Sequence, residues 1–243
     1  MKDNFFDDDV AEGYDDDESG EFAPAVVDSI VSFLAAWAPN GSALELGVGT
    51  GRIALPLRER GLHVEGIDLS SAMVGQMKKK PGGGDIRVVL GDFATTAMDR
   101  TFDLVFIVFN TIMNLTSQQE QVACFANAAS HLTPGGVFVV EVMIPDLRRL
   151  PPGEVLRPFL VQSEALGFDE YDVANQGLVS HHYRINDNHS DVRSIPFRYV
   201  WPAELDLMAT MAGMALRERW SGWRREPYTS ESSKHVSVLE RLE

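Results

Sequence analysis

The sequence has almost no cysteine, because Cys124 is the only one among its 243 residues. A single cysteine excludes an internal disulfide and a cysteine-ligated zinc site. The longest apolar runs, such as residues 104–109 and 136–144, are also far too short to cross a bilayer. The acidic N-terminus carries no basic region followed by an apolar core, so we expect no secretory signal. These absences predict a cytoplasmic protein without a membrane partner.

Positive charge is scarce as well. The chain has 21 lysines and arginines against 36 aspartates and glutamates, which gives a net charge of −15. Proteins that hold nucleic acid by its phosphates need a field of lysine and arginine, so we expect a small-molecule substrate and no nucleic acid. The sequence leaves a homodimer open. Much of the acid lies in residues 1–23, where Phe5, Phe6 and Tyr14 predict an arm that folds down as a lid.

Segments typical of strands alternate with segments typical of helices after this arm. The expected strands are 42–47, 62–68, 86–92, 102–109 and 137–143, and the expected helices are 24–38, 52–60, 71–80 and 118–132. This alternation with short loops predicts a parallel sheet covered on both faces, with its ligand crevice beyond the C-terminal ends of the strands. A helix at 202–214 and two strands near 215–223 and 234–241 are expected to close the sheet as an antiparallel edge.

The chain between these two parts has a different pattern. Residues 178–186 and 192–201 alternate apolar and polar side chains and flank the turn-rich "NDNHSD", which predicts antiparallel strands over the crevice. We expect this insertion to choose the substrate. The predicted organisation is an acidic arm at 1–23, a core at 24–145 and 202–243, and an inserted β-rich substrate-binding segment at 146–201.

The loop "ELGVGTGR" follows a predicted strand and precedes a predicted helix, as a nucleotide-binding loop does. Its glycines alternate at Gly47, Gly49 and Gly51, and Glu45 precedes them. Dinucleotide sites usually have Gly-x-Gly-x-x-Gly and hold pyrophosphate, which a nearby carboxylate would repel. A carboxylate instead attracts a sulfonium and an α-ammonium group. A tight turn that binds nothing is the alternative, but Asp68 at the end of the next strand favours a ligand.

This loop resembles motif I of the class I S-adenosylmethionine-dependent methyltransferases, and the similarity extends over about residues 25–144. The resemblance implies a three-layer α/β/α, Rossmann-like fold. Its sheet has seven strands, mostly parallel with an antiparallel last strand. It also implies S-adenosylmethionine as the cofactor and S-adenosylhomocysteine as its product. No metal is implied, because the cofactor itself supplies the electrophile.

The resemblance also implies roles for single residues. An acid at the end of the second strand bonds the ribose hydroxyls in this family, and Asp68 stands there. Leu69 and Met73 lie in "LSSAM", which matches the segment that lays an apolar side chain on the adenine. In "GDF", Asp92 and Phe93 match an acid that takes the adenine amino group and a neighbour that packs on the ring. Without the resemblance, Met73 would be interpreted as a core residue and Asp92 as a turn residue.

The end of "FDLVFIVFNTIMNL" matches the fourth-strand motif, so Phe109 and Asn110 are implied to face the methionine moiety and the transferred methyl. Arg52, just after the last glycine, either contacts the methionine carboxylate or lies on the helix surface, and we favour the surface. The residues expected to bind the cofactor are therefore Glu45, Gly47, Gly49, Gly51, Asp68, Leu69, Met73, Asp92, Phe93, Phe109 and Asn110.

Three residues are candidates for the chemistry itself. Tyr14 lies in "AEGYDD", which resembles an N-terminal segment that folds over the cofactor in related enzymes. His181 and His182 are adjacent on a predicted strand, so only one of them faces the crevice. His181 is the candidate general base, with an exposed histidine pair as the alternative. Glu141, on the fifth strand, points either to the acceptor or to the opposite side of the strand.

These features predict a methyltransferase that transfers its methyl group by in-line displacement to an amine or a hydroxyl of a small molecule. An aliphatic hydroxyl needs a general base, whereas a neutral amine needs at most a proton acceptor. Two alternatives stay open at this point. One is a non-catalytic regulatory protein that binds S-adenosylmethionine, and the other is an NAD-dependent oxidoreductase.

Overall fold

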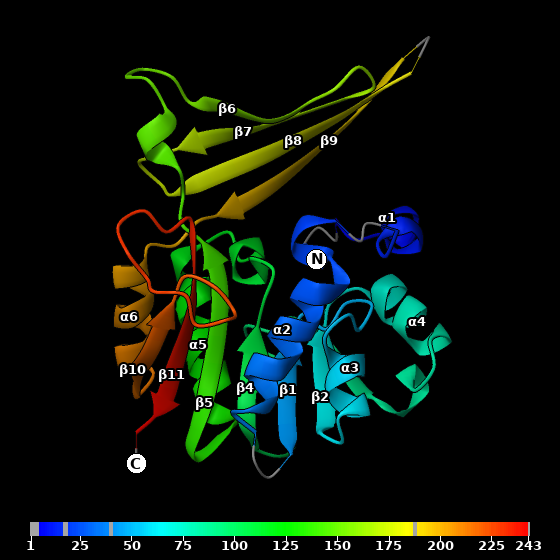
Figure 1. The fold of residues 1–243 in the computed structure, drawn as a ribbon, viewed down its shortest axis with the longest axis vertical. Coiled ribbons are helices and arrows are strands. Elements are labelled where there is room, and N and C mark those ends of the chain that lie inside the picture. The colour runs from blue at the N-terminus through cyan, green and yellow to red at the C-terminus, as the bar shows by residue number, and fades with distance from the viewer. Residues whose placement is uncertain (1–4, 17–18, 39–40, 187–188, 243) are drawn as a thin grey trace.

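The computed structural model of the protein describes residues 5–16, 19–38, 41–186 and 189–242. Of the predicted arm, residues 1–4 and 17–18 lie outside this range. A seven-stranded sheet forms the centre of the molecule (Figure 1). Its strands, in the order in which they pair, are β10 (Met214–Trp220), β11 (Lys234–Arg241), β5 (Leu132–Met143), β4 (Phe102–Ile107), β1 (Ser42–Leu46), β2 (His63–Asp68) and β3 (Arg87–Leu90).

Strands β3, β2, β1, β4 and β5 are parallel, whereas β11 is antiparallel to both β5 and β10. This arrangement confirms the predicted fold class, a mostly parallel seven-stranded sheet whose last strand is antiparallel. The observed strands differ from the predicted ones mainly at their ends. The fifth strand, for example, begins at Leu132 and not at 137, because Leu132 already pairs with Phe102 of β4, before a shift in register that precedes Val137.

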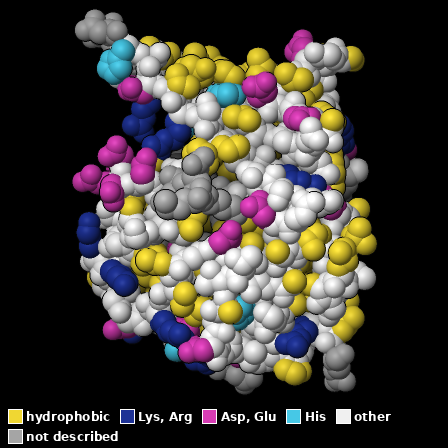
Figure 2. Space-filling model, turned by 180° about the vertical axis from the view of Figure 1, so that it is seen from behind, with side chains coloured by type: hydrophobic (Ala, Val, Ile, Leu, Met, Phe, Trp, Pro, Cys, Tyr) yellow, Lys and Arg dark blue, Asp and Glu magenta, His cyan; other side chains and the backbone are white. Residues whose placement is uncertain are grey.

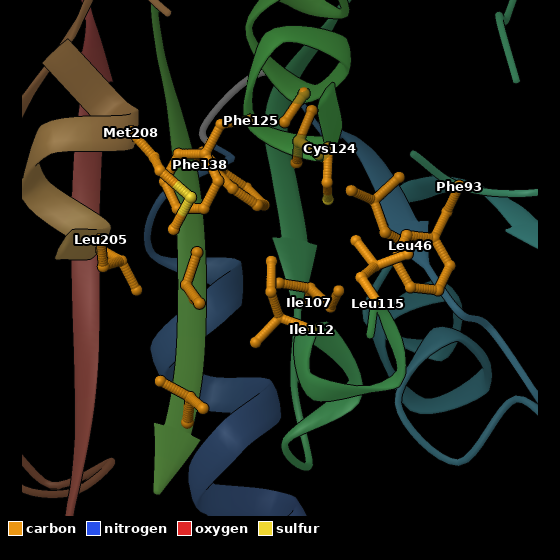
Figure 3. Close-up of a cluster of buried hydrophobic side chains, with 14 of the residues drawn as sticks. Leu46, Phe93, Ile107, Ile112, Leu115, Cys124, Phe125, Phe138, Leu205 and Met208 are labelled. Atoms are coloured by element: carbon orange, nitrogen blue, oxygen red, sulfur yellow. The ribbon is translucent and has the colours of Figure 1, made fainter. Parts of the chain in front are cut away.

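Helices cover both faces of this sheet and make it the middle one of three layers. The helices are α2 (Pro24–Ala35), α3 (Ala54–Glu59), α4 (Ser71–Lys79), α5 (Gln118–Ser130) and α6 (Pro202–Met211). Apolar side chains of α2, α3 and α4 pack on one face, and those of α5 and α6 pack on the other. In Figure 3, Phe125 and Cys124 from α5 and Met208 from α6 lie against Phe138 and Ile107 of the sheet.

Local sequence signals set several helix ends. The Ser70 hydroxyl accepts a hydrogen bond from the Met73 amide at the start of α4. At the start of α5, Ser117 and Glu120 form a reciprocal capping box. Ser70 comes shortly after β2, and Ser117 ends the longer connection after β4. Each cap therefore starts a helix that leads the chain away from the C-terminal edge of the sheet. This edge is therefore bordered by short, well-defined loops.

A second sheet of four antiparallel strands lies above the first in Figure 1. Its strands, in pairing order, are β6 (Leu156–Val161), β7 (Ala165–Asp172), β8 (Gly177–Ile185) and β9 (Ser190–Arg198). Only β8 and β9 were predicted individually. Pro158 in β6 and the acids of "FDEYD" in β7 lower the strand signal of the other two. Hydrophobic side chains gather on the surface of this upper part (Figure 2).

Shorter elements complete the fold. They are α1 (Asp8–Gly13) and the 3₁₀ turns η1 (Gly20–Phe22), η2 (Gly83–Asp85), η3 (Thr111–Asn114) and η4 (Leu147–Arg149). The arm that carries α1 and η1 crosses the upper ends of β1 and β2, below β9 (Figure 1). Among the described residues, no helix is both long and apolar enough to span a bilayer.

Candidate active site

The glycine loop between β1 and α3 lies at the C-terminal edge of the large sheet. The amides of Gly47 and Val48 donate to the Ile67 carbonyl at 2.8 and 3.2 Å, which ties the loop to β2. Gly47 has a φ of 78°, and a Cβ atom there would lie 2.6 Å from Cγ2 of Thr111. At Gly51, with a φ of 77°, a Cβ would lie 2.6 Å from Cγ of Met77. Glycine thus lets η3 and α4 approach the loop closely.

A cavity of about 400 Å³ opens beside this loop, within the usual size of a ligand pocket. It lies between the loops that follow β1, β2 and β3 and the arm that crosses above them. Its lining residues are Phe5, Phe6, Tyr14, Gly47, Gly49, Asp68, Leu69, Ser70, Met73, Asp92, Phe93, Thr111, Asn114, Leu115, Thr116 and Pro196.

Asp68 is fixed at the end of β2 by two backbone amides. Its Oδ2 accepts from Gly49 N at 2.6 Å, and its Oδ1 accepts from Ser70 N at 2.8 Å. Burial raises the pKa of this carboxyl, while the amides of Ser70 and Gly49 oppose the shift. Each carboxylate oxygen has a second lone pair. Asp68 can therefore still accept two hydrogen bonds from a ligand in the cavity.

One wall of the cavity is apolar. Leu69, Met73 and Phe93 line it, and Met73 and Phe93 are buried, while 42% of Leu69 is exposed. Asp92 adjoins this wall, and its Oδ1 accepts from the Ala94 amide at 2.9 Å. A flat ring system with a polar edge fits such a wall, because its faces pack on side chains while its edge meets the carboxylate.

A second, smaller cavity of about 40 Å³ adjoins the first. Glu45 lines it and is 3% exposed, and its Oε2 has no hydrogen-bond partner among the described residues. Burial raises the pKa of Glu45 well above its usual range, and the nearby Asp68 carboxylate adds to this. A buried carboxylate oxygen without a partner is costly. The small cavity is therefore built for a group that donates hydrogen bonds or carries positive charge.

The arm is held over both cavities by contacts from several elements. The Ser70 hydroxyl donates to the Phe6 carbonyl at 2.6 Å, and Asp15 pairs with Lys80 at 2.6 Å. Asp7, at the start of α1, lies 3.4 Å from Arg193 of β9. The ring of Tyr14 lines both cavities. Burial raises the pKa of its hydroxyl, which therefore stays protonated at neutral pH.

Arg52 corrects one expectation, because its side chain is not on the helix surface. It is 12% exposed and lies beneath the arm, where Nη2 donates to the Tyr14 carbonyl at 2.9 Å. Its guanidinium also lies 4.3 Å from the centre of the Phe22 ring. No local pattern predicts this position, because Tyr14 and Phe22 lie far from Arg52 in the sequence and meet it only through the folded arm.

The loop after β4 carries Phe109 and Asn110, which both have positive φ angles, 55° and 60°. Phe109 lines the smaller cavity. The Asn110 side chain points elsewhere, since its Oδ1 accepts from the Met143 amide of β5 at 2.6 Å. Glu141 of β5 is 1% exposed, and its Oε2 accepts from the Phe109 amide at 2.7 Å. Both side chains thus hold this loop, and the lining of the two cavities includes neither.

His181 lies on β8, next to Ser194 of β9, on the same sheet face as Pro196. Both of its ring nitrogens have partners: Nδ1 contacts the Ser194 hydroxyl at 2.8 Å, and Nε2 contacts Glu170 at 3.2 Å. The ring also packs on Phe168, at 5.0 Å between centres. His181 therefore lies on the sheet face that carries Pro196, a lining residue of the large cavity, but is not itself part of the lining.

Comparison with known proteins identifies the family. Residues 43–136 match a family described as a methyltransferase domain. The CcbJ methyltransferase from Streptomyces caelestis is 34% identical and covers 96% of both chains, with a TM-score of 0.84. The chain belongs to the S-adenosylmethionine-dependent methyltransferases.

Two further relatives resemble this methyltransferase over almost their whole length. The cypemycin N-terminal methyltransferase of a Streptomyces species is 29% identical over 239 residues, which is 93% of this chain and 97% of the relative. CalS10 of Micromonospora echinaspora, an amino pentose methyltransferase solved with S-adenosylmethionine bound, covers all of both chains at 21% identity and a TM-score of 0.71. At that identity, the likeness to CalS10 shows the fold.

S-adenosylmethionine is the cofactor of this methyltransferase, and the two cavities fit it. The unpartnered oxygen of Glu45 suits an ammonium group, the remaining lone pairs of Asp68 suit a diol, and the apolar wall suits a purine. Among the described residues, no group of histidine, cysteine or acidic side chains could hold a metal ion.

The sequence did not point to every residue around the cavities. Asn114, Thr116 and Pro196 also line the large cavity, although all three come much later in the sequence than the glycine loop. They lie in η3, the turn after it and β9. Asn114 is inside the fourth-strand motif, but that motif singles out Phe109 and Asn110, and only the tertiary fold brings Asn114 and Pro196 to one cavity. The aromatic residues of the acidic arm and the strands expected over the crevice were the two signals that the cavity is covered.

Proposed function

We propose that this methyltransferase acts on an amine nitrogen of a small-molecule acceptor. The cypemycin relative, which is named as an N-terminal methyltransferase, matches this chain over almost its whole length. The partly matching relative from Streptomyces venezuelae is named as an N,N-dimethyltransferase of an amino sugar. These relatives share a nitrogen acceptor and differ in the molecule that carries it, so we propose the reacting atom and leave the carrier to experiment.

The observation that carries the proposal is the absence of a poised base among the described residues that line the large cavity. A hydroxyl acceptor needs such a base. Tyr14 has a raised pKa and holds its proton, and Asp68 already accepts from two backbone amides. Asp92, the other carboxylate of the lining, accepts from the Ala94 amide beside the apolar wall, where we assign it to the adenine. His181 lies outside the lining, with both ring nitrogens engaged. A neutral amine brings its own lone pair and loses its proton to solvent after transfer.

The residues of the two cavities would divide the binding of the cofactor. Glu45 would hold its ammonium group, Asp68 its ribose hydroxyls, and Asp92 with Met73 and Phe93 its adenine. Gly47 and Gly49 give the ligand room to approach the backbone. The bound cofactor supplies an electrophilic methyl group on a sulfonium.

The protein itself has to align the acceptor and exclude water. Good alignment alone can lower the barrier by about 7–11 kcal/mol. Tyr14 and the loop at Phe109 border the small cavity, so we assign them the positioning of the reacting groups. Thr111 and Asn114 of η3 offer neutral polar groups on the acceptor side. The Asn114 amide nitrogen donates to the Thr111 carbonyl at 3.1 Å, which leaves its amide oxygen to accept from an acceptor N–H.

The test compares matched acceptors that differ only at the reacting atom. The enzyme is incubated with S-adenosylmethionine and with pairs of short peptides and of sugars, one member bearing an amine and the other a hydroxyl at the same position. We expect mass spectrometry to show a gain of one methyl group on amine members alone. Comparable rates for the hydroxyl members would overturn the proposal and would require a base that lies elsewhere.

A further inference from the structure

Lys234, the first residue of β11, joins the large sheet to the arm. Its Nζ lies 2.5 Å from Oε1 of Glu21 in η1 and 3.6 Å from Oε1 of Glu141 in β5. The side chain is 25% exposed, and Glu141 is almost fully buried. Burial lowers the pKa of Lys234, but the carboxylates of Glu141 and Glu21 outweigh this and raise it overall. One ammonium group thus pairs with two carboxylates, one from the arm and one from the large sheet.

The Glu141 end of this contact leads to the loop after β4. Its Oε2 accepts from the Phe109 amide, and the next residue, Asn110, accepts from Met143 N. Phe109 and Asn110 both adopt left-handed backbone angles, which cost energy for residues other than glycine. Such a loop persists only where its surroundings hold it. The Glu141 carboxylate and the Asn110 side chain are the two side-chain acceptors that tie this loop to β5.

The Glu21 end leads to the other wall of the small cavity. Phe22 follows Glu21, and its ring lies 5.2 Å from the ring of Phe109 and 6.3 Å from that of Tyr14. Arg52 stacks on Phe22 and donates to the Tyr14 carbonyl. Displacing η1 would therefore move Tyr14 and release one side of Phe109 together.

We propose that Lys234 is a positioning residue for methyl transfer: by pairing with Glu21 and Glu141 at once, it fixes Tyr14 and the Phe109 loop against each other around the small cavity. The proposal depends on the methyltransferase activity and not on the identity of the acceptor. Without the lysine, the arm loses its ionic link to β5. Glu141, whose pKa burial and the nearby Glu21 already raise to about 7, then either takes up a proton or stays charged beside Glu21. In both cases the arm is the side that moves, because Glu141 is held in the core by the Phe109 amide.

Binding of S-adenosylhomocysteine tests this without an acceptor. In Lys234→Met we expect its dissociation to become about tenfold faster, the effect of losing one partly buried ion pair. Amide hydrogen exchange should also become faster in residues 19–23 and 108–111. Lys234→Arg keeps the charge and should restore both values. Lys79→Met, on the exposed side of α4, is the matched control and should leave both unchanged.

Two further variants separate positioning from a merely structural ion pair. Glu21→Met removes the arm contact and leaves the Lys234–Glu141 pair in the core, so it should speed dissociation even if Lys234→Met fails to fold. Glu141→Gln in the Lys234→Met background leaves no buried charge at this place, and its amide oxygen can still accept from Phe109. It still lacks the bridge to Glu21, so dissociation should stay as fast as in Lys234→Met. Recovery of the wild-type rate would assign the effect to the unpaired charge and would overturn the proposal. If these variants lower the melting temperature but leave dissociation and exchange at the two segments unchanged, Lys234 has no positioning role.

Discussion

The two sheets of the molecule differ in how they are buried. Every residue of β1 after Ser42 is buried, as are most of those in β4, because helices cover both faces. In β6 no residue is buried, and in β9 only Arg198 at its inner end is. The large sheet supplies the loops around the cofactor, and Pro196 is the described residue of the small sheet that lines the cavity. The buried sheet thus supplies most of the cavity lining, and we propose that the open sheet borders the acceptor.

The small sheet is joined to the large one by a buried polar cluster. Arg198, at the end of β9, contacts the side chain of Gln121 in α5 and lies 2.7 Å from Glu204 in α6. Gln121 also donates to the Arg198 carbonyl at 3.0 Å. Buried charges that are fully hydrogen-bonded define a single geometry. The open sheet therefore has a fixed base, although its outer strands have little burial of their own.

The largest effect is expected at Asp68. Asp68→Ala removes the carboxylate proposed to hold the ribose and also releases the Gly49 and Ser70 amides. Hydrogen bonds to charged groups contribute about 1.5–3 kcal/mol each, so affinity for S-adenosylhomocysteine should fall about 100-fold or more. Isothermal titration measures this. The exposed Asp99, paired with Arg87, is the control, and Asp99→Ala should bind normally. Unchanged affinity in a folded Asp68→Ala variant would contradict the assigned site.

A smaller effect with a distinct pH dependence is expected at Glu45. Its pKa is raised in the free protein, whereas a cofactor ammonium favours the ionised form, so binding should release a proton. Affinity should then rise with pH through the raised pKa, and the slope counts the protons released. Glu45→Gln should bind about tenfold more weakly and lose most of this slope. Titrations in buffers of different ionisation enthalpy count the protons, and an equal count in both proteins would refute the assignment.

The smallest effect is expected in the open sheet. His181→Ala should leave affinity for S-adenosylhomocysteine unchanged and lower kcat only a few-fold, because His181 lies outside the cavity lining. Loss of a true general base would instead lower kcat about 100-fold or more. A larger fall in kcat would restore His181 as the base and favour a hydroxyl acceptor. Pro196→Trp, on the same sheet face but in the cavity lining, should raise the acceptor KM without affecting the cofactor. A raised acceptor KM in Pro196→Trp, together with a nearly unchanged kcat in His181→Ala, would place the acceptor beside Pro196 and away from His181.

Sequence reasoning reached the large sheet because its signals are local. Strands alternate with helices, Ser70 and Ser117 mark helix starts, and the alternating glycines directly follow a strand. The seven strands and the antiparallel last strand followed from those signals together with the family resemblance.

The rest depends on contacts between distant segments. Arg52 is beneath the arm because Tyr14 and Phe22 return to it, and Glu141 faces the Phe109 amide because two parallel strands end together. No pattern within a short stretch of sequence encodes either contact. The strands β6 and β7 escaped prediction for a different reason: Pro158 and the acids of β7 weaken the strand signal, whereas β8 and β9 of the same sheet keep their alternation.

Strand β11 has a consequence for how the protein is made. It lies between β5 and β10, so β5 gains its second neighbour only after residues 234–241 have been synthesised. Until then the nascent chain carries a long apolar strand with one open edge, and such edges pair readily with other chains. We therefore expect the newly made protein to be most prone to aggregation until residues 234–241 have left the ribosome and paired with β5.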